Sequence, residues 1–180
     1  MDSFDDLIAR CLCREPAAEK RLYDRLAPVL LGLCRRYFAN PEDAEDAMIQ
    51  SLLTVFEKLP QFRYEGSFEG WARRIAVHTS LMALRKKKVD FSSAEDVASL
   101  DVPADFSLDS QDRTEAILAC VQALPEGYRT VFNLFAVEGY SHAEIADALG
   151  ISEATSKSQY SRARARLQSV LTAKGLNRAD

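Results

Sequence analysis

Short polar side chains and arginines share one side of a C-terminal segment in a pattern that suits DNA. The spacing i, i+3, i+4, i+7 and i+11 is filled by Thr155, Ser158, Gln159, Arg162 and Arg166, which places them on one side of a helix. Residues 154–178 hold six bases and no acid. Hydroxyl and amide groups near a helix N-terminus, with arginines behind them, match the acceptors of a DNA major groove. On charge alone, a solvated basic face that binds nothing is the alternative.

Two helices joined by a tight turn are predicted to hold this polar face. The sequence Ser141-His142-Ala143-Glu144 matches a capping box, which predicts the start of a helix over 142–149. Gly150 supplies the turn, because glycine adopts a left-handed conformation at little cost. The second helix, over 153–173, turns an apolar stripe inward. That stripe consists of Ser156, Tyr160, Ala163, Leu167 and Val170. The pattern predicts a helix-turn-helix.

An N-terminal helix over 41–58 carries a second chemically unusual surface. Asn40 is its predicted N-cap, and Pro41 occupies its first position. Its outer stripe holds Asp46, Ile49, Gln50, Leu53 and Glu57. A polar-rimmed apolar strip favours a protein partner, unless another helix of the same module covers it. The acids at the helix start complement its dipole, and with no histidine near them a metal site is not expected.

Aromatic and basic residues alternate over a loop at 61–70 and a helix predicted over 67–88. The loop contains Phe62, Tyr64 and Phe68, and the helix presents Trp71, Arg74, His78 and Arg85 before a basic ending at 85–88. Aromatic rings beside cations bind single-stranded nucleic acid, where bases stack and phosphates pair. Alternatively, Phe62, Phe68 and Trp71 are core residues, and the basic ending complements the helix dipole.

The charge of the 180-residue chain is unevenly distributed. Its formal net charge of −4 argues at first against nucleic acid, but residues 1–88 carry +2, residues 89–112 carry −7 and residues 113–180 carry +1. The acidic stretch is rich in Ser and Asp, contains a proline, has no sustained helical period, and is predicted to be an exposed linker. We therefore expect an all-α protein of two small helical bundles joined by an acidic flexible linker. The expected domains are 1–90, the linker 91–112 and the helix-turn-helix domain 113–176, with no further domain after it.

Several function classes are disfavoured by the same sequence. No apolar run is long enough to cross a bilayer, so a cytoplasmic protein is expected. The four cysteines are too few and irregular for a disulfide framework, and the Cys11-x-Cys13 pair lacks a second pair at zinc spacing. His78 and His142 have no Ser or Cys at triad-like spacing, and no phosphate-binding glycine loop occurs. We expect no enzyme, no cofactor, no metal and no small-molecule substrate.

The C-terminal segment resembles the promoter-binding domain of the extracytoplasmic-function (ECF) sigma factors of RNA polymerase. The matching sequence is LPEGYRTVFNLFAVEGYSHAEIADALGISEATSKSQYSRARARL. Family positions are matched in register by Thr155, Lys157, Ser158, Arg162, Ala163 and Arg164. Gln159 stands where the family usually has arginine. The resemblance implies that the helix over 153–171 reads the −35 promoter element. The −35 contacts we expect are Thr155, Lys157, Ser158, Gln159, Arg162 and Arg166.

The N-terminal module resembles the same family through D-A-E-D-A at 43–47, F-x-x-W at 68–71 and R-I-A at 74–76. The resemblance implies that Asp46, Ile49, Gln50, Leu53 and Glu57 dock on the β′ coiled coil of core RNA polymerase. It also implies that the aromatic loop and the helix after it hold a base flipped from the −10 element. The −10 contacts we expect are Arg63, Tyr64, Ser67, Trp71, Arg74, His78, Arg85 and Lys86. Many family members have Asn in place of His78 and Asp in place of Met82.

Taken together, the resemblance implies a sigma factor that binds core polymerase and directs promoter recognition, −10 melting and initiation. The implied partners are the β′ coiled coil and β flap of the polymerase, double- and single-stranded promoter DNA, and an anti-sigma factor. The free protein is expected to be a monomer. Two alternatives remain open: a free-standing helix-turn-helix regulator, which leaves the strip of Ile49 and Leu53 unexplained, and a sigma-mimicking interaction module, which the basic recognition face disfavours.

Overall fold

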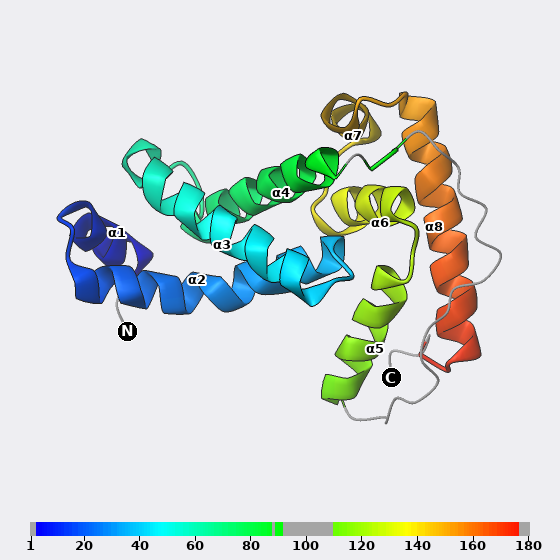
Figure 1. Cartoon of the computed structure of the whole chain (residues 1–180), viewed down its shortest axis with the longest axis horizontal. Helices are drawn as coiled ribbons and strands as arrows, with labels where there is room; N and C mark the ends of the chain where they lie inside the picture. The colour runs from blue at the N-terminus through cyan, green and yellow to red at the C-terminus, as the bar shows by residue number, and fades with distance from the viewer. Residues whose placement is uncertain (1–2, 88, 92–109, 177–180) are drawn as a thin grey trace. The chain divides into compact units, whose positions relative to one another are not determined.

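The protein folds as two helical units, Met1–Lys86 and Lys87–Asp180, in a computed structural model (Figure 1). The structure describes residues 3–87, 89–91 and 110–176. Every regular element in these ranges is a helix, and no strand occurs among them. The expectation of an all-α fold is confirmed. Most of the predicted acidic linker, residues 92–109, lies outside the described residues.

The N-terminal unit is built around one long helix. Helix α2 (Pro16–Tyr37) packs on α1 (Phe4–Leu12), α3 (Pro41–Lys58) and α4 (Phe68–Lys86). A 3₁₀ turn, Leu59–Gln61, follows α3 directly. The apolar side of α2 repeats every three or four residues, as one helix face requires, and it is fully buried at Leu22, Leu26, Leu30 and Leu33.

The C-terminal unit contains α5 (Ser110–Gln122), α6 (Glu126–Phe132), α7 (His142–Leu149) and α8 (Glu153–Ala173). The helix expected over 126–138 is α-helical only to Phe132 and continues as a π-helical turn, Asn133–Val137. Helix α8 packs against α5, α6 and α7. The core between α5, α6 and α8 is formed by Cys120, Val121, Leu124, Tyr128, Ala163 and Leu167.

The helix-turn-helix is fixed by hydrogen bonds at both helix starts. The backbone N–H of Glu144 donates to Oγ of Ser141 at 3.2 Å, and the N–H of Ser141 donates to the Glu144 carboxylate at 2.8 Å. These bonds to Ser141 hold the pKa of the Glu144 carboxyl below its usual range. The stability that the ionised carboxylate contributes is therefore fully present at pH values above the usual pKa of a glutamate, and it is lost as the pH falls through the lowered pKa. The N–H of Thr155 donates to Oγ of Ser152 at 2.9 Å, which caps α8.

Two glycines, one in the turn of the helix-turn-helix and one inside α2, should respond to substitution by alanine with opposite changes in stability. Gly150 sits between α7 and α8 with φ +68°, so Gly150→Ala should lower the free energy of unfolding of the C-terminal unit by about 1–2 kcal/mol. Gly32 is interior to α2 and nothing lies within 4 Å of a Cβ built there, so Gly32→Ala should stabilise the N-terminal unit by roughly 0.5–1 kcal/mol. Thermal unfolding of both variants checks the two signs, and a stable Gly150→Ala protein would contradict the first.

Candidate functional surfaces

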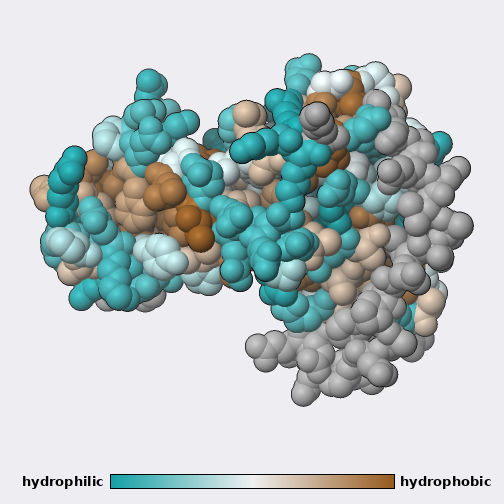
Figure 2. All heavy atoms as spheres, in the orientation of Figure 1, coloured by the Kyte–Doolittle hydropathy of each residue, from teal (hydrophilic) through white to brown (hydrophobic). Residues whose placement is uncertain are grey.

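Helix α3 presents an apolar strip to solvent. Asn40 starts the helix, because its side chain accepts hydrogen bonds from the N–H groups of Glu42 at 2.8 Å and Asp43 at 3.4 Å. Opposite the buried face, Ile49 is 49% exposed and Leu53 is 59% exposed. The remaining predicted members, Asp46, Gln50 and Glu57, are exposed around them. Figure 2 shows hydrophobic surface in the region of α3. Since both side chains are about half exposed, no helix among the described residues covers the strip, and the alternative that the module buries it is wrong.

Aromatic rings support the loop between α3 and α4. The Phe62 ring lies 5.1 Å from Phe68 and 5.4 Å from Trp71, centroid to centroid, and Phe68 stacks on Trp71 at 5.5 Å. Phe62 and Phe68 are buried and Trp71 is half-buried, so the core interpretation holds for the two phenylalanines. Phe4 of α1 joins the cluster, 5.4 Å from Phe68. The cluster is therefore a rigid base for the loop.

One side chain of this loop projects from the aromatic base. Tyr64 is 51% exposed, its ring centroid lies 4.9 Å from that of Phe62, and its φ of +59° is left-handed. Such a conformation is costly for a residue with a Cβ and is found most often at functional sites. Its half-exposed ring is tilted by 53° to that of Phe62 and is accessible for stacking on a base.

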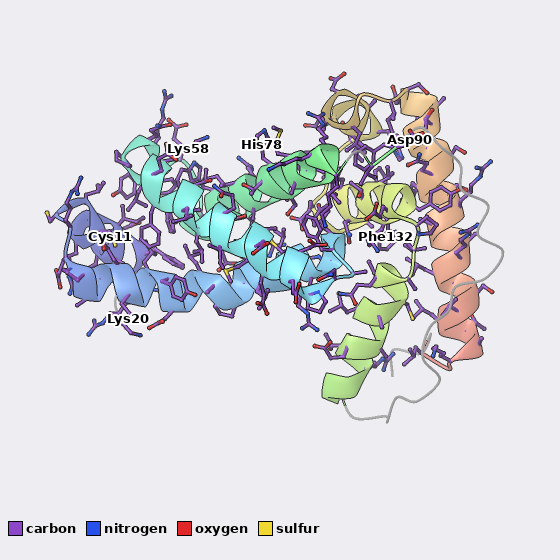
Figure 3. The ribbon with its side chains drawn as sticks, in the orientation of Figure 1. Cys11, Lys20, Lys58, His78, Asp90 and Phe132 are labelled. Atoms are coloured by element: carbon purple, nitrogen blue, oxygen red, sulfur yellow. The ribbon has the colours of Figure 1, made fainter. Side chains whose placement is uncertain are left out.

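The predicted nucleic-acid residues of α4 lie on one side of the helix. Arg74, His78 (labelled in Figure 3) and Arg85 are exposed, and so is Met82, which completes the 3–4 spacing. Lys86 and the loop residue Arg63 are also exposed. Ser67 is exposed but has a structural role as well, since its Oγ accepts from the N–H of Gly70 at 3.0 Å at the start of α4. The face combines cations, an imidazole and an apolar side chain.

Helix α8 exposes a narrower set of the predicted −35 side chains than its sequence indicates. Lys157, Ser158 and Arg162 are exposed, and Thr155 is half-buried beside its cap. Lys157 pairs with Glu153 at 2.6 Å. That pair holds the pKa of Glu153 below its usual range. Ser161 and Arg164 are exposed in the same part of α8. Neither residue is among the predicted −35 contacts, although Arg164 matches a family position in register.

Gln159 is the exception among the predicted −35 residues. The expectation that it shares the exposed face is wrong, because it is only 3% exposed. Its Nε2 donates to the backbone carbonyl of Phe91, and its side chain lies beside Gly127 at the start of α6. On a helical wheel with 100° per residue, Gln159 lies at 340° from Ser152, between the polar stripe and the inward stripe of α8. The sequence therefore leaves its side ambiguous, and the contacts with Phe91 and Gly127 bury it.

Tyr128 of α6 supports two of the α8 arginines. Nη1 of Arg162 donates to the Tyr128 hydroxyl at 3.4 Å, and the Arg166 guanidinium lies over the Tyr128 ring at 5.2 Å from its centroid. Arg166 is half-buried, so its predicted exposure is only partial. Tyr128 itself is 1% exposed. The buried Tyr128 side chain therefore contacts both arginines, Arg162 through its hydroxyl and Arg166 through its ring.

Three of the four thiols are buried. Burial raises the pKa of Cys34 to about 11 and raises those of Cys11 and Cys120, whereas Cys13 is exposed. Because the thiolate is the nucleophile, iodoacetamide near neutral pH should modify Cys13 alone in the native protein. Peptide mass spectrometry of the alkylated protein checks this, with urea-unfolded protein as the control. Fast modification of Cys34 before unfolding would contradict the packing of α2 on α4.

In the part of the chain that the structure describes, no cluster of three or more His, Cys, Asp or Glu side chains could hold a metal ion. Among those same residues, no helix has both the length and the apolarity needed to cross a bilayer.

Both units match known protein-family models. Residues 22–89 match Sigma-70 region 2, and residues 114–167 match Sigma-70, region 4. The region 2 match includes the α3 strip and the α4 face, and the region 4 match includes α7 and most of α8. These two regions define a sigma-70-type transcription initiation factor.

Similarity to individual sigma factors shows which family of sigma factors the chain belongs to. The chain is 30% identical over 167 residues to the ECF RNA polymerase sigma factor SigM of Mycobacterium tuberculosis, covering 92% of this chain and 83% of SigM. It is 28% identical to SigW of Bacillus subtilis, covering 77% and 81%. The chain belongs to the ECF family of RNA polymerase sigma factors. As a sigma factor it binds core RNA polymerase and promoter DNA and directs transcription initiation.

Solved structures show the same fold. CnrH, solved in complex with the cytosolic domain of CnrY, has a TM-score of 0.50 at 23% identity and covers 93% of this chain and 96% of CnrH. The sigma factor RpoE of Bartonella quintana, solved with the anti-sigma factor NepR, has a TM-score of 0.51 at 24% identity, covering 85% and 96%. The expectation of two helical bundles with a C-terminal helix-turn-helix is supported by these likenesses.

Proposed function

We propose that the two units divide promoter recognition between three surfaces. The strip on α3 binds the β′ coiled coil of core polymerase, the Tyr64 loop and the α4 face bind the −10 element, and the exposed face of α8 binds the −35 element. The observation that carries the proposal is the pair of exposed apolar side chains, Ile49 and Leu53, on a helix whose opposite face is fully packed. A free-standing DNA-binding regulator has no use for such a strip.

The −10 surface suits an unstacked base. Tyr64 offers an exposed ring, and Arg74 and His78 are exposed on the α4 face that follows the loop. Taking a base out of a duplex costs a few kcal/mol, which stacking and phosphate contacts must offset. Because the aromatic base under the loop is already packed, the protein need not order it when DNA binds.

The −35 surface is assigned to Lys157, Ser158, Ser161, Arg162 and Arg164, with Thr155 at the helix start. Their exposed hydroxyl, ammonium and guanidinium groups match the acceptors of base edges and phosphates. The proposed role is promoter recognition without catalysis, and the proposed place of action is the cytoplasm, where the polymerase and the chromosome meet.

Since RpoE was solved with an anti-sigma factor, we propose that an anti-sigma factor also controls this protein.

Reconstituted transcription tests the proposal. The purified chain is mixed with core polymerase and a library of randomised promoters, and run-off transcripts are sequenced. The expected result is copurification with core and transcripts that share −35 and −10 sequences. A chain that neither copurifies nor initiates would overturn the proposal. Equal footprints on promoters with and without core would instead favour the free-standing regulator.

A further inference from the structure

Residues 89–91, which we name the strap, lie on the recognition helix itself. Phe91 is only 5% exposed, although it stands within a stretch whose sequence reads as a solvated linker. Its backbone carbonyl accepts a hydrogen bond from Nε2 of Gln159 in α8. A Cβ built on Gly127 would lie 3.8 Å from Cα of Phe91 and 3.5 Å from Oε1 of Gln159. The strap therefore occupies a site made by the start of α6 and the side of α8.

The strap lies next to side chains proposed to contact DNA. Thr155 precedes Gln159 by one helical turn, and Arg162 follows it by three residues, so all three are neighbours on α8. Asp90, labelled in Figure 3, places an exposed carboxylate directly before Phe91. A duplex that reaches the side chains of Thr155 and Arg162 in its major groove also approaches the strap beside them.

The docked state also has an unsatisfied polar group. Oε1 of Gln159 is buried and accepts no hydrogen bond from the described residues. A buried acceptor without a donor opposes the docking that Phe91 burial favours. A docked contact that carries this cost is easier to open than one in which every buried polar group is paired.

We propose that the strap is an autoinhibitory segment, docked through Gln159 and Phe91, that must leave α8 before α8 enters the −35 groove. This inference rests on the proposed −35 role of α8. In this proposal Gln159 holds the strap on α8, whereas its position in the sequence predicts a contact with DNA. Binding of DNA and docking of the strap are then mutually exclusive, and each weakens the other by the same factor.

The affinity of the full-length protein for a −35 duplex tests the inhibitory role. The probe is a fluorescent duplex carrying the −35 sequence selected by transcription, and binding is followed by anisotropy. Phe91→Ala and Gln159→Ala should each tighten binding about three- to tenfold. Phe91→Leu, which keeps an apolar side chain in the site, is the matched control and should bind as the wild type does. Unchanged or weaker binding by both alanine variants would overturn the proposal.

Chymotryptic cleavage after Phe91, located by mass spectrometry, reports docking without reference to affinity. The wild type should be cleaved there slowly, Gln159→Ala several-fold faster, and the wild type faster again when the −35 duplex is present. A cleavage rate that the duplex does not change would contradict mutual exclusion. If Gln159→Ala speeds cleavage but no variant, the wild type included, binds the duplex, docking stands while the −35 role and the inhibition fail together.

Discussion

Leu53→Glu should weaken binding to core RNA polymerase by at least about 100-fold, equivalent to about 2.7 kcal/mol. Leu53 is the most exposed large apolar side chain among the described residues, at 59%, so the free protein loses little packing when it is replaced. Burying a leucine in an interface contributes about 1.5–3 kcal/mol, and a carboxylate buried there without a partner adds a further cost. Titration of labelled protein with core polymerase measures the change.

The matched control is Leu12→Glu. Leu12 ends α1 and is 46% exposed, so the chemical change is the same on a different surface. This variant should bind core as the wild type does, and both variants should keep the wild-type circular dichroism and melting temperature. Retained core binding by Leu53→Glu would show that the strip lies outside the polymerase interface.

Arg162→Ala should weaken binding to the −35 duplex by about 1–3 kcal/mol, which is roughly 5- to 150-fold. Arg162 is exposed on α8 and is steadied by the Tyr128 hydroxyl. The matched control is Gln168→Ala, also exposed on α8 but two turns nearer its C-terminus, which should cost little. Anisotropy titrations over a range of salt concentrations measure both.

The salt series separates the two ways in which Arg162 can act. A phosphate contact predicts equal weakening on specific and scrambled duplexes and a salt slope smaller by about one. A base contact predicts loss on the specific duplex, with specificity relaxed at one base pair. Wild-type affinity of Arg162→Ala on both duplexes would remove this residue from the recognition face.

Most of the fold could be predicted because its signals are local. Asn40 and Pro41 start α3, Ser141 and Glu144 start α7, and Gly150 ends it, all as their residue types indicate. The π-helical turn at Asn133–Val137 was not predicted. Helical periodicity in sequence does not distinguish α from π hydrogen bonding over one turn.

The errors at the candidate site have a different physical origin. Gln159 was assigned to the exposed face by its polarity, yet its burial depends on Phe91, 68 residues earlier in the chain. No short-range pattern reports such a contact. Phe62 and Phe68 posed the same difficulty, since an aromatic residue near cations is equally compatible with stacking on a base and with packing in a core. The exposed strip at Ile49 and Leu53 was predictable because polar neighbours already surrounded it.

The aromatic base of the Tyr64 loop has a consequence for exchanging promoter specificity between relatives. Phe4 lies 5.4 Å from Phe68, and the Arg25 guanidinium lies over the Phe4 ring at 3.8 Å from its centroid. The first helix and α2 therefore support a loop that begins more than fifty residues after Phe4. A chimera that receives only the loop and α4 would place foreign rings on the resident Phe4. The smallest transplantable recognition unit is therefore discontinuous: α1, with its partner Arg25, has to travel with the loop.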